Sequence, residues 1–158
     1  MRLLGKIRSS QSPIYLSFAE GFDSLIGIDL PSRQSVILLI SDSSEVNTRV
    51  IYSAAEYLLG AGLVYVCVWG DDCERVHDIF DEAEVGDGSV DRDTCFMSTW
   101  HNRDTLDEAI EFFLTCATPP ECDLACTSYL AVVVGDQDLH DVVGQKIIAA
   151  EQGGETDS

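Results

Sequence analysis

Four apolar runs of strand length alternate along this chain with four segments that have the periodicity of an amphipathic helix. The apolar runs cover residues 35–41, 63–69, 94–100 and 128–135. The helical segments cover residues 46–58, 76–83, 106–117 and 139–150. Runs that are apolar throughout are typical of strands buried on both faces, and their alternation with helices favours a parallel sheet. The sequence therefore predicts an α/β fold with three layers, α-β-α, and about four parallel strands.

We expect a flavodoxin-like or Rossmann-like arrangement, with these four strands in the order 2-1-3-4. The length of 158 residues fits a single domain, which we place at residues 14–150. Its first residues, 14–18, could form a further short strand. Residues 1–13 are polar and aperiodic and predict a loose N-terminal arm, and residues 151–158 predict a disordered acidic tail. Asp42 with Glu45, and Asp71 with Glu74, have the spacing of helix-starting capping boxes, and Asp104 is expected to open the third helix.

The charge of the chain limits its partners. Nine basic and 28 acidic residues give a net charge of −19. Such a surface repels nucleic-acid phosphates and anionic membranes, so we expect neither as a partner. It attracts basic proteins, although acidity that only keeps the protein soluble, or that reflects a salty or lysine-poor host, explains the same composition.

The hydropathy of the chain predicts a cytoplasmic protein. No apolar run reaches 18 residues, and the N-terminus is too poor in apolar residues for a signal peptide. In that compartment the six cysteines are expected as free thiols, with Cys67 and Cys95 in the core. We expect no cofactor, because no glycine-rich phosphate loop follows any predicted strand and neither the Walker nor the Gly-x-Ser-x-Gly pattern occurs.

Chemistry-bearing residues gather where the predicted strands end. Parallel strands end at one edge of the sheet, where open α/β folds place their sites. We therefore expect Asp72, Cys73, Trp100 and His101 to line one depression there. The candidate binding residues are Trp69, Asp72, Thr99, Trp100 and Asp136. An exposed tryptophan beside a crevice is a recognition group, whereas a buried one would only cover the end of the core.

Cys73 and His101 are the candidate catalytic residues. Cys73 opens a predicted helix, whose dipole favours a thiolate, and His101 could act as its base with Thr99 or Asp72 orienting the ring. The adjacent Asp71 and Asp72 oppose a thiolate. A half-buried cysteine and a histidine at a strand end explain the same residues without catalysis.

We predict no metal site. Asp42, Asp71, Asp72 and Asp136 follow strands and could converge on Mg²⁺ or Ca²⁺, but aspartate in these positions usually caps a helix. The residues Cys116, Cys122 and Cys126 lack the second short-spaced pair of a zinc site.

Two phrases carry a resemblance to a known family. The chain has Trp-Gly-Asp-Asp-Cys at 69–73 and Thr-Trp-His at 99–101, followed by Leu-Asp-Glu-Ala at 106–109 and Phe112–Phe113. Over about residues 14–135 it resembles a family of small bacterial proteins built around a domain of unknown function, marked by Trp-Gly-x-Asp-Cys and Thr-Trp-His. The resemblance implies a stand-alone α/β domain and no assigned activity.

The function we expect is a binding or regulatory module, of the kind used by immunity proteins. It would recognise a protein or ligand at the carboxyl edge of the strands, with a basic protein as the expected partner. This expectation depends on the negative charge, the two tryptophans at strand ends and the absence of a cofactor motif. The alternative is a hydrolase or transferase that uses Cys73 as nucleophile and His101 as base.

Overall fold

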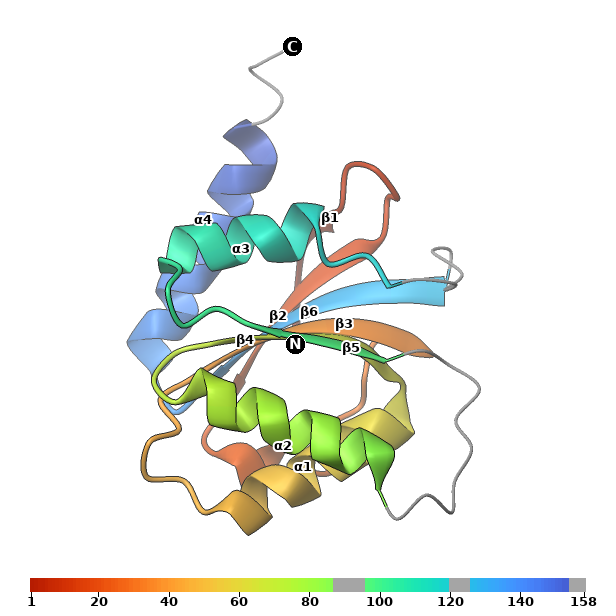
Figure 1. Cartoon of the computed structure of the whole chain (residues 1–158). Helices are drawn as coiled ribbons and strands as arrows, with labels where there is room; N and C mark the ends of the chain where they lie inside the picture. The colour runs from red at the N-terminus through yellow and green to blue at the C-terminus, as the bar shows by residue number, and fades with distance from the viewer. Residues whose placement is uncertain (87–95, 120–125, 154–158) are drawn as a thin grey trace.

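A mostly parallel sheet lies between two layers of helices (Figure 1). The computed structural model describes residues 1–86, 96–119 and 126–153. The strands are β1 (Arg2–Lys6), β2 (Pro13–Ala19), β3 (Gln34–Ser41), β4 (Leu63–Trp69), β5 (Met97–Trp100) and β6 (Thr127–Val134). The helices are α1 (Thr48–Ala61), α2 (Cys73–Val85), α3 (Leu106–Thr115) and α4 (Gln137–Gly153), with a 3-10 turn η1 at Phe22–Leu25. The three-layer α/β prediction is confirmed.

The described part of the chain forms a sheet in the order β1-β2-β6-β3-β4-β5. All neighbours from β2 to β5 are parallel, and β1 is antiparallel to β2. The predicted order 2-1-3-4 is wrong, because the four predicted strands lie in the order fourth, first, second, third. Burial explains the arrangement: β3 and β6 are apolar along nearly their whole length and lie at the centre, whereas β5 carries Ser98 and Thr99 and lies at an edge.

Each face of the sheet has its own core. One core lies under α1, α2 and η1, and includes Phe22, Ile51 and Phe80. The other lies under α3 and α4, and includes Phe113 and Ile147. Figure 1 shows the two helix pairs on opposite sides of the sheet. We call these sides the α1/α2 face and the α3/α4 face.

The two ends of the chain are more ordered than we predicted. The expected loose arm, residues 1–13, contains β1, which pairs with β2 and packs beside α4. Its pattern is hard to recognise because a register shift between Leu3 and Gly5 breaks the alternation of an edge strand. At the other end α4 continues to Gly153, so the expected tail at 151–158 begins as helix. Residues 154–158 lie outside the described residues.

Three of the predicted helix starts are also corrected. The N-cap of α1 is Asn47, whose side chain accepts from the N–H of Arg49, while Asp42 accepts from the backbone and hydroxyl of Ser44. Asp72 precedes α2, but its carboxylate makes no cap bond. Helix α3 begins after Thr105, which forms a capping box with Glu108. Local polar partners thus compete for the aspartates we expected as caps.

Candidate functional site

The residues selected from the sequence do meet at the carboxyl edge, but they divide between the two faces of the sheet. Side chains alternate along a strand, so Trp69 and His101 lie on the α3/α4 face. Cys73 and Trp100 lie on the α1/α2 face, Cys73 in its core and Trp100 against His77 of α2. The sheet therefore separates the imidazole of His101 from the thiol of Cys73.

A depression of about 270 Å³ opens at this edge on the α3/α4 side. It is lined by Ile40, Ser41, Asp42, Trp69, Gly70, Asp71, His101, Asn102, Asp104 and Leu139. Of the four residues expected to share one depression, only His101 lines it. Trp69, one of the binding candidates, lines it as well.

His101 is held on both sides of its ring. Its Nδ1 lies 2.7 Å from Oδ2 of Asp104, and its Nε2 lies 2.9 Å from the hydroxyl of Thr99. The carboxylate can only accept, so it places the proton of the neutral ring on Nδ1, and Nε2 then accepts from Thr99. The ring packs against Phe112 at a centroid distance of 4.8 Å and is 6% exposed. Thr99 therefore contacts the imidazole, as we expected for an orienting residue, whereas Asp72 does not lie on this face.

Asp104 is the residue of this cluster that we did not select from the sequence. The carboxylate of Asp104 contacts the ring of His101, and the main-chain oxygen of Asp104 accepts from the indole N–H of Trp69 at 2.9 Å. The three-residue spacing in His101-Asn-Arg-Asp104 is the signal that could have identified it. The cluster is a hydroxyl–imidazole–carboxylate chain, which can order the ring and pass a proton along it.

Cys73 is a buried thiol. It is 2% exposed, and burial raises its pKa, an effect that the backbone N–H groups of His101, Cys73 and Glu74 partly offset. The sulfur thus faces the main chain of His101. Cys67 lies deeper in the sheet, where burial raises the pKa of its thiol to about 12. Cys67 is a core residue as predicted, while Cys95 and Cys122 lie outside the described residues.

These positions predict the order of thiol reactivity. A thiol with a raised pKa carries little thiolate below that pKa, and the thiolate is the nucleophile. In folded protein at pH 8 we therefore expect iodoacetamide to label the exposed Cys116 at least about tenfold faster than Cys67 or Cys73. Peptide mass spectrometry measures the three rates, with urea-unfolded protein as the control in which they converge. Rapid labelling of folded Cys73 at pH 7 would instead support a catalytic thiolate.

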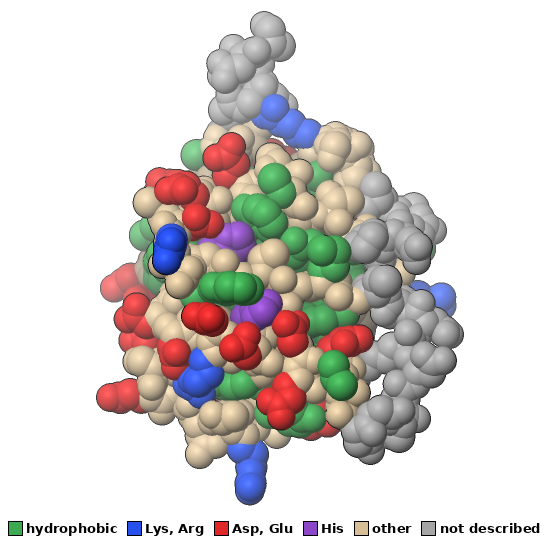
Figure 2. All heavy atoms as spheres, in the orientation of Figure 1, with side chains coloured by type: hydrophobic (Ala, Val, Ile, Leu, Met, Phe, Trp, Pro, Cys, Tyr) green, Lys and Arg blue, Asp and Glu red, His purple; other side chains and the backbone are tan. Residues whose placement is uncertain are grey.

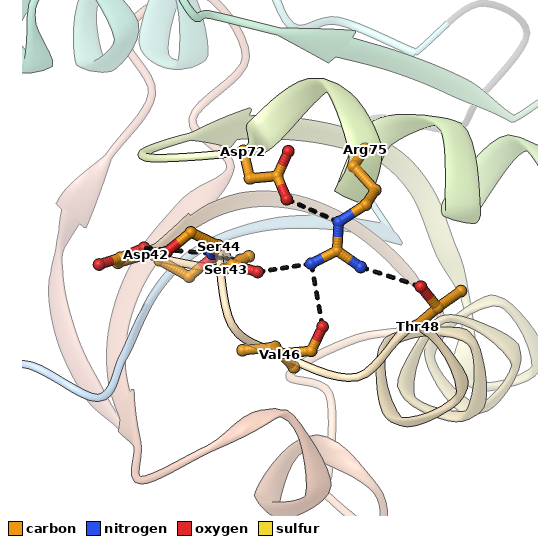
Figure 3. A network of polar contacts seen from close by, with 8 residues as sticks. Asp42, Ser43, Ser44, Val46, Thr48, Asp72 and Arg75 are labelled. Carbon is orange, nitrogen blue, oxygen red and sulfur yellow. Dashed lines mark hydrogen bonds and ion pairs between the residues drawn. The ribbon is translucent and has the colours of Figure 1, made fainter.

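Asp72 takes part in a network that joins two loops at the carboxyl edge (Figure 3). Its carboxylate accepts from Nε of Arg75 at 2.6 Å, and its own backbone has φ of 67°. The guanidinium of Arg75 also donates to the hydroxyl of Thr48 and to the main-chain oxygens of Ser43 and Val46. Arg75 therefore ties the β3–α1 loop to the start of α2, and Asp72 positions Arg75.

Trp100 is the large aromatic side chain that this edge leaves open. It is 43% exposed, and its ring contacts that of His77 at a centroid distance of 4.4 Å with the two ring planes tilted by 53°. His77 is buried beneath it. The ring nitrogens of His77 lie 3.0 Å from Asp78 and 3.4 Å from Asp81, and Asp81 also accepts from Ser98 of β5.

Asp136 caps the helix that follows β6. Its carboxylate accepts from the N–H of Leu139 at 3.0 Å, at the start of α4.

Asp42 is fully exposed, and its bonds from the side chain and backbone of Ser44 lower its pKa. Within residues 1–86, 96–119 and 126–153, no three His, Cys, Asp or Glu side chains are placed to hold a metal ion together.

No helix among the described residues has both the length and the apolar character to cross a membrane. Neither a curated protein nor a solved structure matches the chain. A family model described as a domain of unknown function, DUF7684, matches residues 19–150. This match spans most of the chain and agrees with the resemblance at the level of a domain of unknown function. The chain belongs to the DUF7684 family.

Proposed function

We propose that this protein is an acidic binding module that captures a basic, extended segment of a partner protein along β5. The observation that carries the proposal is Trp100, a large aromatic side chain that is 43% exposed on a short strand. Tryptophan is the residue type most enriched among the side chains that dominate binding energy at interfaces. Its hydrophobic ring, already held by His77 on one side, would bury further area without first having to be ordered.

The strand that bears Trp100 suits the addition of a partner strand. In the described part of the chain the sheet order ends at β5, which pairs with β4. The outer edge of an end strand presents backbone N–H and C=O groups that an extended peptide can use. Met97, at the other end of β5, is also exposed and supplies a second apolar contact.

The charge around Trp100 selects a basic partner. Asp78 and Asp81 flank His77 beneath the tryptophan, and both carboxylates are largely exposed. Figure 2 shows acidic side chains beside hydrophobic and histidine side chains on the face of the molecule that carries α2 and β5 in Figure 1. A guanidinium can stack on an indole while it hydrogen-bonds to carboxylates, so an arginine of the partner fits this surface best.

The regulatory, immunity-type role in a bacterial cytoplasm is part of this proposal. The resemblance to small bacterial proteins supports it, and the free thiols of Cys67, Cys73 and Cys116 suit a reducing compartment. The alternative, a hydrolase or transferase based on Cys73 and His101, would require the sulfur to reach the other face of the sheet. It would also require His101 to release Thr99 or Asp104. We therefore rank it below the binding module.

The test is a titration with an N-acetylated peptide of four Arg-Val repeats, followed by calorimetry and by the fluorescence of Trp100. We expect saturable binding that weakens with salt, and Trp100→Ala should weaken it at least about tenfold. Asp78→Asn should weaken it by a smaller factor. An equally long Glu-Val peptide should not bind.

Two matched variants control for general effects. Val142 is exposed to a similar extent, 40%, on α4, and Asp141 contacts His140 as Asp78 contacts His77. Val142→Ala and Asp141→Asn should both leave the affinity unchanged. Equal losses in the control and test variants, or undiminished binding by Trp100→Ala, would contradict the proposal.

A further inference from the structure

A second cavity lies on the α3/α4 side of the sheet, beside the β1–β2 hairpin. It has a volume of about 510 Å³, within the range of small-molecule sites, and is enclosed by the β1–β2 hairpin, α3 and the C-terminal half of α4. It is lined by Lys6, Ile7, Arg8, Ser9, Ile14 and the α3 and α4 residues Asp107, Ile110, Glu111, Leu114, Thr115, Lys146, Ala150 and Glu151. We call it the hairpin cavity. None of these residues belongs to the site described above.

The floor of the hairpin cavity is apolar. Ile7, Ile14 and Ile110 are each buried, and they belong to the core of the α3/α4 face. Leu114, which packs partly against the same core, extends this apolar surface along α3. A hydrocarbon chain placed here would leave water on contact with aliphatic side chains, which is favourable in proportion to the apolar area that it buries.

The rim of the cavity carries as many basic as acidic side chains, three of each, in a protein whose net charge is −19. Lys6, Arg8 and Lys146 line it, so it holds both lysines of the chain and three of its nine basic residues. Lys146 forms an ion pair with Asp107 at 2.8 Å. Arg8 donates to the main-chain oxygen of Glu151. Because that oxygen is a neutral acceptor, the contact does not compensate the charge of Arg8. Among the described residues, no ion pair involves the side chain of Lys6 or of Arg8.

The walls of the cavity are held in place without a ligand. The Lys146–Asp107 pair joins α4 to α3 across the opening. The carboxylate of Glu151 accepts from the backbone N–H of Lys6 at 2.8 Å, so the end of α4 is fixed to the hairpin. That approach needs the glycine at position 5, because a Cβ there would overlap the Glu151 carboxylate. The acidic side chains are divided between α3, which carries Asp107 and Glu111, and the end of α4, where the Glu151 carboxylate lies beside the hairpin and accepts from the Lys6 N–H.

We propose that the hairpin cavity binds a single-chain anionic amphiphile. Its carboxylate or phosphate head would lie against Lys6 and Arg8, and its hydrocarbon chain would cover the isoleucine floor. A guanidinium with an ammonium beside it provides charge-assisted hydrogen bonds to either head group. Glu111, which also lines the cavity, would repel a second acidic group, so an amphiphile with a single acidic head is favoured. This site is independent of the partner surface at β5.

The experiment is calorimetric titration of the full chain with decanoate and with decyl phosphate, each below its micelle-forming concentration. We expect saturable binding of at least one of the two probes with a stoichiometry of one, and the tighter probe identifies the head group. Decanol and decyltrimethylammonium should bind at least about tenfold more weakly, because neither brings the negative charge that Lys6 and Arg8 complement.

Variants locate the site. Lys6→Gln together with Arg8→Gln should weaken binding about tenfold or more, whereas Arg33→Gln together with Arg49→Gln, which removes as much charge elsewhere, should leave it unchanged. Leu114→Trp, which fills the cavity, should abolish binding while circular dichroism shows the native fold. The proposal is overturned if neither probe saturates, if decanol binds as well as both anions, or if the two double variants weaken binding equally.

Discussion

Replacing Gly70 with alanine is expected to destabilise the protein by roughly 3–5 kcal/mol. Gly70 follows β4 and has φ of 123°, a backbone conformation that residues with a Cβ atom rarely adopt. An alanine methyl at this position would also overlap the carbonyl oxygen of Ser41, at the end of the neighbouring β3. Both the strained φ and the overlap with Ser41 involve backbone atoms, so no change of side-chain rotamer can relieve them.

The damage would extend beyond the turn itself. Ser43 donates its N–H to the oxygen of Asp71, and Arg75 joins the same two loops. Moving Gly70 away from Ser41 would disturb both contacts, and with them the depression at the carboxyl edge. Urea unfolding followed by circular dichroism measures the change in the free energy of unfolding.

Gly60→Ala is the matched control. Gly60 lies within α1, and a Cβ there would meet no heavy atom within 4 Å. Alanine is the better helix former, so this variant should be stabilised by about 0.5–1 kcal/mol. A loss below about 1 kcal/mol in Gly70→Ala would show that the turn can relax, and our account of its close approach to β3 would be wrong.

The sequence predicted the edge at which the site residues meet but not the face on which each of them lies. The prediction of the edge succeeded because four parallel strands must end together, which places positions 69–73 and 99–101 near each other whatever the strand order. The face depends on the register between β4 and β5, in which Val68 pairs with Trp100. Periodicity within one strand contains no information about that register, so Cys73 and His101 could not be separated in advance.

Strand order was partly within reach of the sequence. The polar residues Ser98 and Thr99 mark β5 as less buried than the other predicted strands, and this indicates an edge position. The place of β6 between β2 and β3 depends on β2, which pairs with it along its whole length. The sequence predicts only a candidate short strand at residues 14–18 and a loose arm at residues 1–13, so it does not determine the complete strand order.

Polar side chains were the least predictable part of the site. Asp72 has the residue type and position of a helix cap, but Arg75 takes its carboxylate instead. Asp104 was expected to open α3, but it contacts His101 and leaves the cap to Thr105. In both cases aspartate is a residue type that commonly caps helices. The outcome depended on a competing partner that only the folded chain brings near.

The hairpin cavity is even harder to predict from the sequence, because the residues that line it are distant along the chain. Lys6 and Lys146 are separated by nearly the whole chain, and they line one cavity because β1 returns along β2 and α4 packs over both. The scarcity of lysine was visible in the composition. Its meaning was not, since nothing in either lysine's local sequence points to the other.

Replacing Phe113 with alanine is expected to cost about 3–5 kcal/mol, while the same change at the adjacent Phe112 should cost about 1–2 kcal/mol. Phe113 is fully buried in the α3/α4 core and makes an edge contact with Tyr129 at a centroid distance of 5.5 Å. Its removal leaves a cavity that β3, β4 and β6 cannot collapse to fill. Phe112 is only partly buried, so part of its space is open to water.

The two phenylalanine variants also distinguish an effect on the stability of the fold from an effect on the position of the His101 ring. Phe112 covers the ring of His101, so Phe112→Ala should shift and broaden the imidazole NMR signals while most of the fold stays intact. Phe113→Ala should lower the midpoint of urea unfolding and leave those signals in place in the remaining folded protein. If Phe112→Ala proved the more destabilising of the two, the packing of α3 against the sheet would be rotated from the one we describe. An unchanged imidazole spectrum in Phe112→Ala would mean that Thr99 and Asp104 alone hold the ring.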